Sequence, residues 1–162
     1  MPLKIKVHAH IRPRETVAEG LAHALTGPLY LQIGEDIFFP HEGAGTVIAP
    51  VLDWWLQNAA RLLRPDTEVD NATMDSSAVF HAKRVASTDD VILRLCDSAG
   101  RPAGEYTVSY RRYLAALRGA LKSLLHETAE HGLESHRDSE SLRVNLVHLE
   151  RLEEQIKRNG LP

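Results

Sequence analysis

Two histidines near the start of the chain are the first side chains that could bind a metal ion. His8 and His10 lie two residues apart in the segment Leu3–Ile11, where apolar and polar residues alternate. Side chains at positions i and i+2 of a strand share a face. One alternative is therefore a small metal-dependent enzyme that uses both imidazoles and a distant acid. The other is that these histidines, with Lys4 and Lys6, form the solvated face of an edge strand.

The remaining catalytic patterns are incomplete. His126 and His131 are five residues apart, which separates them by roughly 140° on a helix, so one helix does not present both to one ion. Cys96 is the single cysteine, which excludes an internal disulfide and a cysteine-based zinc site. The segment Gly43–Gly45 lacks the lysine of a phosphate-binding loop. We therefore expect a protein that is not an enzyme and holds no cofactor.

Acidic residues are concentrated in one short segment, which is the candidate binding surface. Between residues 66 and 75 the chain carries four acids and no base, namely Asp66, Glu68, Asp70 and Asp75. Residues 66–110 carry eight acidic and four basic side chains, whereas the net charge of the whole chain is −3. This balance argues against nucleic-acid binding, which needs Lys and Arg to displace phosphate counterions. It suits a partner protein with a basic surface; the alternative is a solvated loop or edge strand.

The composition is typical of one soluble globular domain. The chain has 162 residues, of which 43% are hydrophobic and 25% charged. No apolar run approaches the ~20 residues that a membrane span requires. The first ten residues, MPLKIKVHAH, also lack the apolar core of a signal peptide. We expect a cytoplasmic protein that does not contact a membrane.

The first half of the chain predicts a short sheet. The alternation over Leu3–Ile11 indicates a strand, and the apolar spacing over Thr16–Leu25 indicates a helix that ends at Gly27 and Pro28. Leu29–Phe39 then reads as a hairpin, because two apolar runs flank a turn that contains glycine.

A longer helix follows this hairpin and predicts the centre of the core. Thr46 is the expected N-cap, and the helix runs to about Leu63 with Pro50 in its first turn, where a missing N–H leaves no bond unmade. Trp54 and Trp55 lie on its wide apolar face. We expect both tryptophans to be buried.

The second half predicts strands and then helices. Three alternating segments separated by turn-forming residues indicate an antiparallel meander: Ser77–Val85, Val91–Cys96 and Glu105–Ser109. The chain then predicts one helix that ends at Gly132 and a second, capped by Asp138 or Ser139, that ends at Gly160.

These elements predict a single α+β domain over residues 1–162. An antiparallel sheet packs against the central helix, and the last two helices form a hairpin beside them. A third functional alternative follows from this helical end. The protein could be a homo-oligomeric regulatory or scaffold protein, or a homodimer, that associates through its C-terminal helices.

The order of these parts resembles a group of small bacterial proteins. The matching residues are Phe39-Pro40 at a strand end, the Leu52–Trp55 pattern on the helix, and the strand that contains Phe80. Over residues 28–125 the chain is similar to immunity proteins of bacterial polymorphic-toxin and contact-dependent inhibition systems, although it departs from their pattern in the segment 71–80, where Asn71–Asp75 replace the expected glycine and aromatic residues. The resemblance implies an antitoxin that binds and occludes a cognate toxin.

Overall fold

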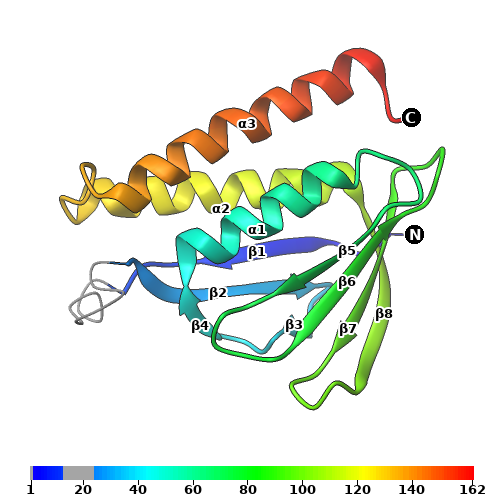
Figure 1. Cartoon of the computed structure of the whole chain (residues 1–162), viewed down its shortest axis with the longest axis horizontal. Helices are drawn as coiled ribbons and strands as arrows, with labels where there is room; N and C mark the ends of the chain where they lie inside the picture. Colours follow the sequence, from blue (N-terminus) through cyan, green and yellow to red (C-terminus); the bar gives the residue numbers. More distant parts are fainter. Residues whose placement is uncertain (1, 13–23) are drawn as a thin grey trace.

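The first part of the chain forms a four-stranded antiparallel sheet. The computed structural model describes residues 2–12 and 24–162. In this sheet β2 pairs with β1 on one side and with β3 and β4 on the other. Figure 1 shows the strands of this sheet, which are β1 (Ile5–Ala9), β2 (Thr26–Ile33), β3 (Ile37–Phe39) and β4 (Gly45–Val47). The predicted first strand and hairpin are confirmed.

The predicted early helix falls largely outside the described residues, which resume at Ala24. Gly27 and Pro28 do not end a helix. Both belong to β2, where they are the register partners of Thr46 and Gly45 in β4. The backbone N–H of His10 donates to the carbonyl of Pro28 (3.0 Å). Proline at this position still accepts a hydrogen bond, so it is compatible with the strand.

The second sheet is a four-stranded antiparallel meander. Its order is β5-β6-β7-β8, so β5 and β8 are the outer strands. The strands are β5 (Glu68–Ala72), β6 (Val79–Arg84), β7 (Asp90–Cys96) and β8 (Pro102–Ser109). The three predicted strands are confirmed, and the acidic run contributes the fourth. The two sheets meet where the N–H of Leu3 donates to the carbonyl of Thr107 (2.8 Å).

Three helices complete the described structure, and the class is α+β with two sheets instead of the predicted one. They are α1 (Ile48–Arg61), α2 (Tyr110–Glu130) and α3 (Arg137–Asn159). Helix α1 contacts strands of both sheets, and α2 packs against β1. Helix α3 packs on α2 and α1 and lies on the side of the molecule away from the sheets (Figure 1). Among the described helices, none is long and apolar enough to cross a membrane.

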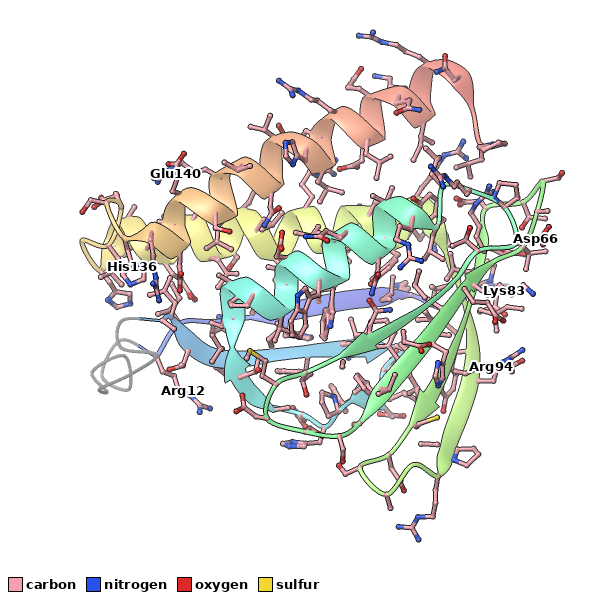
Figure 2. The ribbon with its side chains drawn as sticks, viewed as in Figure 1. Arg12, Asp66, Lys83, Arg94, His136 and Glu140 are labelled. Carbon is pink, nitrogen blue, oxygen red and sulfur yellow. The ribbon has the colours of Figure 1, made fainter. Side chains whose placement is uncertain are left out.

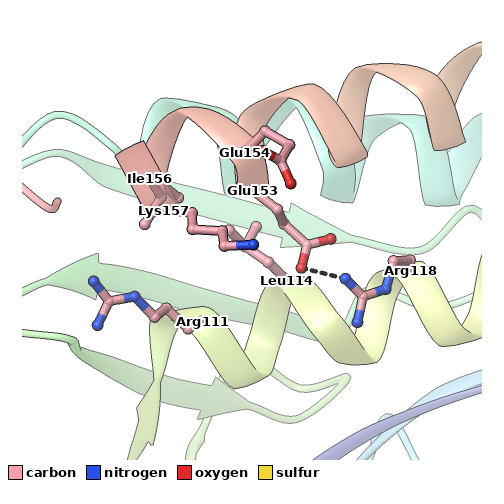
Figure 3. Close-up of a pocket in the computed structure, with 7 residues that line it drawn as sticks. All are labelled: Arg111, Leu114, Arg118, Glu153, Glu154, Ile156 and Lys157. Atoms are coloured by element: carbon pink, nitrogen blue, oxygen red, sulfur yellow. Dashed lines mark hydrogen bonds and ion pairs between the residues drawn. The ribbon is translucent and has the colours of Figure 1, made fainter. Parts of the chain in front are cut away.

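The two C-terminal helices form the predicted hairpin. Between them lies a groove of about 480 Å³ that Figure 3 shows in close-up. Arg118 of α2 donates to Glu153 of α3 across this groove (2.6 Å). Loss of water raises the pKa of the Glu153 carboxyl, and the neighbouring Arg118 opposes that shift. The ion pair therefore bridges the two helices beside their apolar contact.

The helix caps differ from the prediction. Thr46 belongs to β4, and the N-cap of α1 is Val47, whose side chain makes no cap hydrogen bond. The N-cap of α3 is His136, whose ring nitrogen accepts the N–H of Asp138 (3.0 Å). The carboxylate of Asp138 instead accepts the N–H of Leu25 (2.8 Å). Strand pairing takes up the backbone of Thr46, whose hydroxyl has no hydrogen-bond partner among the described residues, and a tertiary contact takes up the side chain of Asp138.

The two tryptophans have different environments. Trp55 is fully buried and packs edge-to-face on Phe80, with ring centroids 5.2 Å apart. Its indole N–H donates to the carbonyl of Ala72 (2.9 Å). Trp54 is 46% exposed, so the prediction that both are buried is wrong for this residue. Adjacent helical residues point about 100° apart, and the covered face of α1 is too narrow to include both.

Arg84 is buried completely at the end of β6. Its guanidinium donates to four backbone oxygens: Leu62 (2.8 Å), Leu63 (2.9 Å), Thr88 (3.1 Å) and Pro162 (2.7 Å). Leu62 and Leu63 lie just past the last turn of α1, where a cation is favoured by the helix dipole. One side chain therefore joins the end of α1, the β6–β7 turn and the last residue.

We expect Arg84→Met to lower the free energy of unfolding by about 3 to 5 kcal/mol, because buried carbonyl oxygens lose their donors. Arg84→Lys should recover only part of this loss, since an ammonium cannot reach all four acceptors in the same fork. Urea denaturation measures both values. Arg94→Met, at an exposed position of the same sheet, is the control and should cost under about 1 kcal/mol.

Two buried tyrosines on α2 differ in the hydrogen bonding of their hydroxyl groups. The hydroxyl of Tyr110 donates to the carbonyl of Ala59 (2.7 Å). The hydroxyl of Tyr113 is buried and has no hydrogen-bond partner among the described residues. Burial raises the pKa of both phenols, so neither ionises near neutral pH.

We expect opposite effects when each hydroxyl is removed. Tyr110→Phe should lower the free energy of unfolding by about 1 to 2 kcal/mol, because the Ala59 carbonyl loses its donor. Tyr113→Phe should raise it by about 1 kcal/mol, because an unpaired buried hydroxyl is removed. Thermal and urea unfolding measure both changes. Equal losses in the two variants would contradict the difference in hydrogen bonding.

Candidate protein-binding face

Alternate residues of the second sheet face away from the core and form ordered rows. The central row contains Asp70, His81, Arg94 and Glu105, which are register partners across the four strands. Asp70 pairs with His81 at one end, and Arg94 pairs with Glu105 at the other (2.8 Å). This arrangement follows from the two-residue period of a strand, because Phe80, Leu93 and Leu95 point inward between these positions.

The neighbouring rows differ in polarity. One contains Glu68, Lys83, Ile92 and Thr107, and its Lys83 Nζ lies 3.8 Å from Glu68 Oε1. The other is mostly apolar and contains Ala72, Val79, Cys96 and Pro102. We call these three rows together the outer sheet face. Lys83 and Arg94 point away from the helices (Figure 2).

The ion pairs on the outer sheet face are open to solvent. The exposed fraction of the side chain is 60% for Glu68, 71% for Asp70 and 59% for Glu105. Exposed pairs of this kind contribute about 0 to 1 kcal/mol each. A hollow of about 180 Å³ is lined by Glu68 and Asp70, by their partners Lys83 and His81, and by Ile92 and Arg94. The carboxylates can therefore exchange their present partners for those of another protein at little cost.

The four predicted binding residues fall into two groups. Glu68 and Asp70 lie together on the outer sheet face, because they alternate with the buried Val69. Asp66 precedes β5 in a turn, where its φ is 62°, and Asp75 follows β5 in the next loop. Figure 2 shows Asp66 at one corner of the molecule. The structure brings two of the acids together and places the other two past opposite ends of the strand.

The second sheet is more acidic at its surface than its sequence indicates. None of the eight acids in residues 66–110 is buried, whereas one of the four bases, Arg84, is completely enclosed. Three bases remain to balance eight acids. Asp97 extends this acidic character to the β7–β8 turn. The N–H groups of Arg101 and Ala99 donate to its carboxylate (2.9 Å each), and these bonds, Arg101 first, hold its pKa below the ordinary value.

The free edge of β5 is covered by side chains of α1. Asn58 donates to the carbonyl of Asp70 (2.9 Å), and Trp55 donates to that of Ala72. An uncovered edge would invite pairing with a strand of another chain. Since these carbonyls are already bonded, a partner would contact the side chains of the outer sheet face.

His8 and His10 bind different partners. His8 Nε2 lies 2.8 Å from Gln32 Oε1, and its ring stacks on Tyr30 with centroids 4.7 Å apart. His10 Nδ1 lies 2.9 Å from Glu127 Oε1. Within the part of the chain that the structure describes, no group of three or more His, Cys, Asp or Glu residues could hold a metal ion.

Sequence reasoning missed the basic half of the outer sheet face. His81, Lys83 and Arg94 were inside predicted strands, and the alternation of those strands could have placed them outward. The same alternation places Arg84 inward beside Phe80 and Ala82. A charged residue at an inward position was the available signal for the buried cation.

No protein-family model matches this chain, and no curated protein or solved structure matches it.

Proposed function

We propose that this chain is a non-enzymatic immunity protein of the cytoplasm, which binds a cognate bacterial toxin and occludes it. The observation that carries the proposal is the surplus of acids at the surface of the second sheet and its turns, where none of the eight acids is buried and only three of the four bases lie outside the core. The resemblance of residues 28–125 to immunity proteins supports the same class. The partner surface would be basic, as in the substrate cleft of a nuclease.

The geometry suits recognition by side chains on a rigid support. Glu68 and Asp70 are fixed to β5, which is paired to β6 along its whole length. Long-range attraction by the acidic surface would raise the rate of encounter, and it would weaken as salt screens the charges. The half-buried Val79, Ile92 and Cys96 supply apolar area beside the charges, where a partner's side chains could exclude water.

Joint neutralisation of the four acids tests this proposal. The variant Asp66→Asn, Glu68→Gln, Asp70→Asn and Asp75→Asn should bind the toxin domain encoded directly upstream at least about tenfold more weakly, through a slower association rate. The intact chain should bind that domain stoichiometrically, block its activity and lose affinity as salt rises. Calorimetry, stopped-flow mixing and growth of cells that express the toxin measure these effects.

A charge-matched control distinguishes the loss of acids at this surface from the change in the net charge of the protein. The control neutralises four exposed acids outside the second sheet, namely Glu35, Asp36, Glu42 and Glu134. It should retain the affinity of the intact chain. Unchanged affinity in the first variant would exclude the outer sheet face as the binding surface. A neighbouring toxin that is neither bound nor inhibited would overturn the proposed function.

A further inference from the structure

Helix α3 carries a continuous exposed stripe on the side that does not face the molecule. The buried face of α3 contains Leu142, Leu149 and Ile156. The stripe on the opposite side repeats at alternating spacings of three and four residues, which keeps all its members on one face of a helix. Its seven members are all exposed: Arg137, Glu140, Val144, Val147, Arg151, Glu154 and Arg158. We call these residues the α3 stripe.

The centre of the α3 stripe is apolar. Val144 is 44% exposed and Val147 is 45% exposed, so both belong to the few large hydrophobic side chains that the described structure leaves in solvent. Charged residues flank this pair on both sides. An apolar centre with a charged periphery is the usual composition of a protein–protein contact.

The charges along the α3 stripe are ordered so that two antiparallel copies place opposite charges against each other. When two copies run antiparallel with a two-fold axis between residues 145 and 146, Val144 faces Val147 of the second copy. Glu140 then faces Arg151, and Arg137 faces Glu154. Every charged position of the stripe from Arg137 to Glu154 meets the opposite charge in this register, and the symmetry forms each pair twice, while Arg158 lies beyond the paired segment. A parallel pair would place each charge opposite itself, which is repulsive.

We propose that the α3 stripe joins two copies of this chain as an antiparallel helix pair. The paired segment, residues 137–154, is about 26 Å long at 1.5 Å per residue. Figure 2 shows Glu140 on the outer side of α3, away from the other helices. A hollow of about 540 Å³ beside Val147, Arg151 and Glu154 leaves room for side chains of the second copy.

Contacts within one chain leave these charges available to a second copy. Arg137 Nε lies 3.7 Å from Asp138 Oδ1, which is beyond hydrogen-bond distance. One carboxylate oxygen of Glu140 already accepts a hydrogen bond from Arg143 (2.9 Å). The other oxygen is left for Arg151 of the second copy. Arg158 lies 4.0 Å from Glu154 in an exposed pair, and such pairs contribute only tenths of a kcal/mol. The stronger pair, Arg118 with Glu153, points into the groove between α2 and α3 (Figure 3).

The dimer would leave the outer sheet face free. Helix α3 lies on the far side of the molecule from the β5–β8 sheet (Figure 1). The inference is therefore independent of the proposed function, and either could fail alone. Because one pair of helices buries less area than a standard interface, we expect a dissociation constant on the order of 10 to 100 µM.

Sedimentation equilibrium of the untagged full chain, from about 5 µM to 1 mM around this expected constant, tests the dimer. The intact chain should change from monomer to dimer over this range. Val144→Ser with Val147→Ser should weaken association at least about tenfold, because the apolar centre is lost. The matched control is Val85→Ser, another exposed valine, which lies just after β6 and should leave association unchanged. A chain that stays monomeric throughout, or a serine variant that dimerises normally, would overturn the proposal.

Charge exchange tests the antiparallel register. Glu140→Arg and Arg151→Glu should each weaken the dimer at least about tenfold, because each converts two attractive pairs into repulsive ones. The double variant should return to within about threefold of the intact chain, since its pairs are attractive again. Failure of this rescue would exclude the register. Circular dichroism checks folding, and Glu154→Arg with Arg137→Glu provides the same comparison at the outer pair if either first variant unfolds.

Discussion

The position of the second sheet depends on one buried cation. A guanidinium without water is stable only when its donors meet acceptors, and Arg84 meets backbone oxygens from three separate parts of the chain. Two of these oxygens lie where α1 ends, so the helix and β6 are fixed to each other. Strand β5 begins only a few residues after this junction. The edge strand that carries Glu68 and Asp70 is thereby held beside α1.

This arrangement also determines the charge of the surface. Arg84 is one of four bases in residues 66–110. Because it is buried, it does not offset the negative charge at the surface. Of the remaining charges, Glu68, Asp70 and Glu105 stand on alternate positions of paired strands, so each of these three acids has a cross-strand partner. The acids on this face are weakly paired, and further acids in the adjoining turns, such as Asp66 and Asp75, add to the negative charge of the same sheet. A basic partner would find carboxylates that are already aligned and cost little to release.

The sequence predicted those features that depend on local periodicity. Alternation identified the first strand and the meander, two apolar runs around a glycine turn identified the hairpin, and the three- and four-residue spacing identified α1, α2 and α3. Features that depend on packing were not predictable in this way. Whether Trp54 or Trp55 enters the core depends on how much of α1 the sheets cover. The caps of α1 and α3 changed because the backbone of Thr46 pairs with Gly27 in the first sheet and the N–H of Leu25 donates to the carboxylate of Asp138. For the candidate site, the acids were predicted, whereas their pairing with His81 and Lys83 required the strand register.

Cys96 has a practical consequence for the study of this surface. It lies in the apolar row of the outer sheet face, is partly accessible and is the single cysteine of the chain. A thiol-reactive fluorophore would therefore attach at one known position without any mutation of the protein. Its emission would respond to the loss of water when another molecule covers the neighbouring Val79. The chain thus contains a natural attachment point for an optical reporter on the surface where a signal would be most informative.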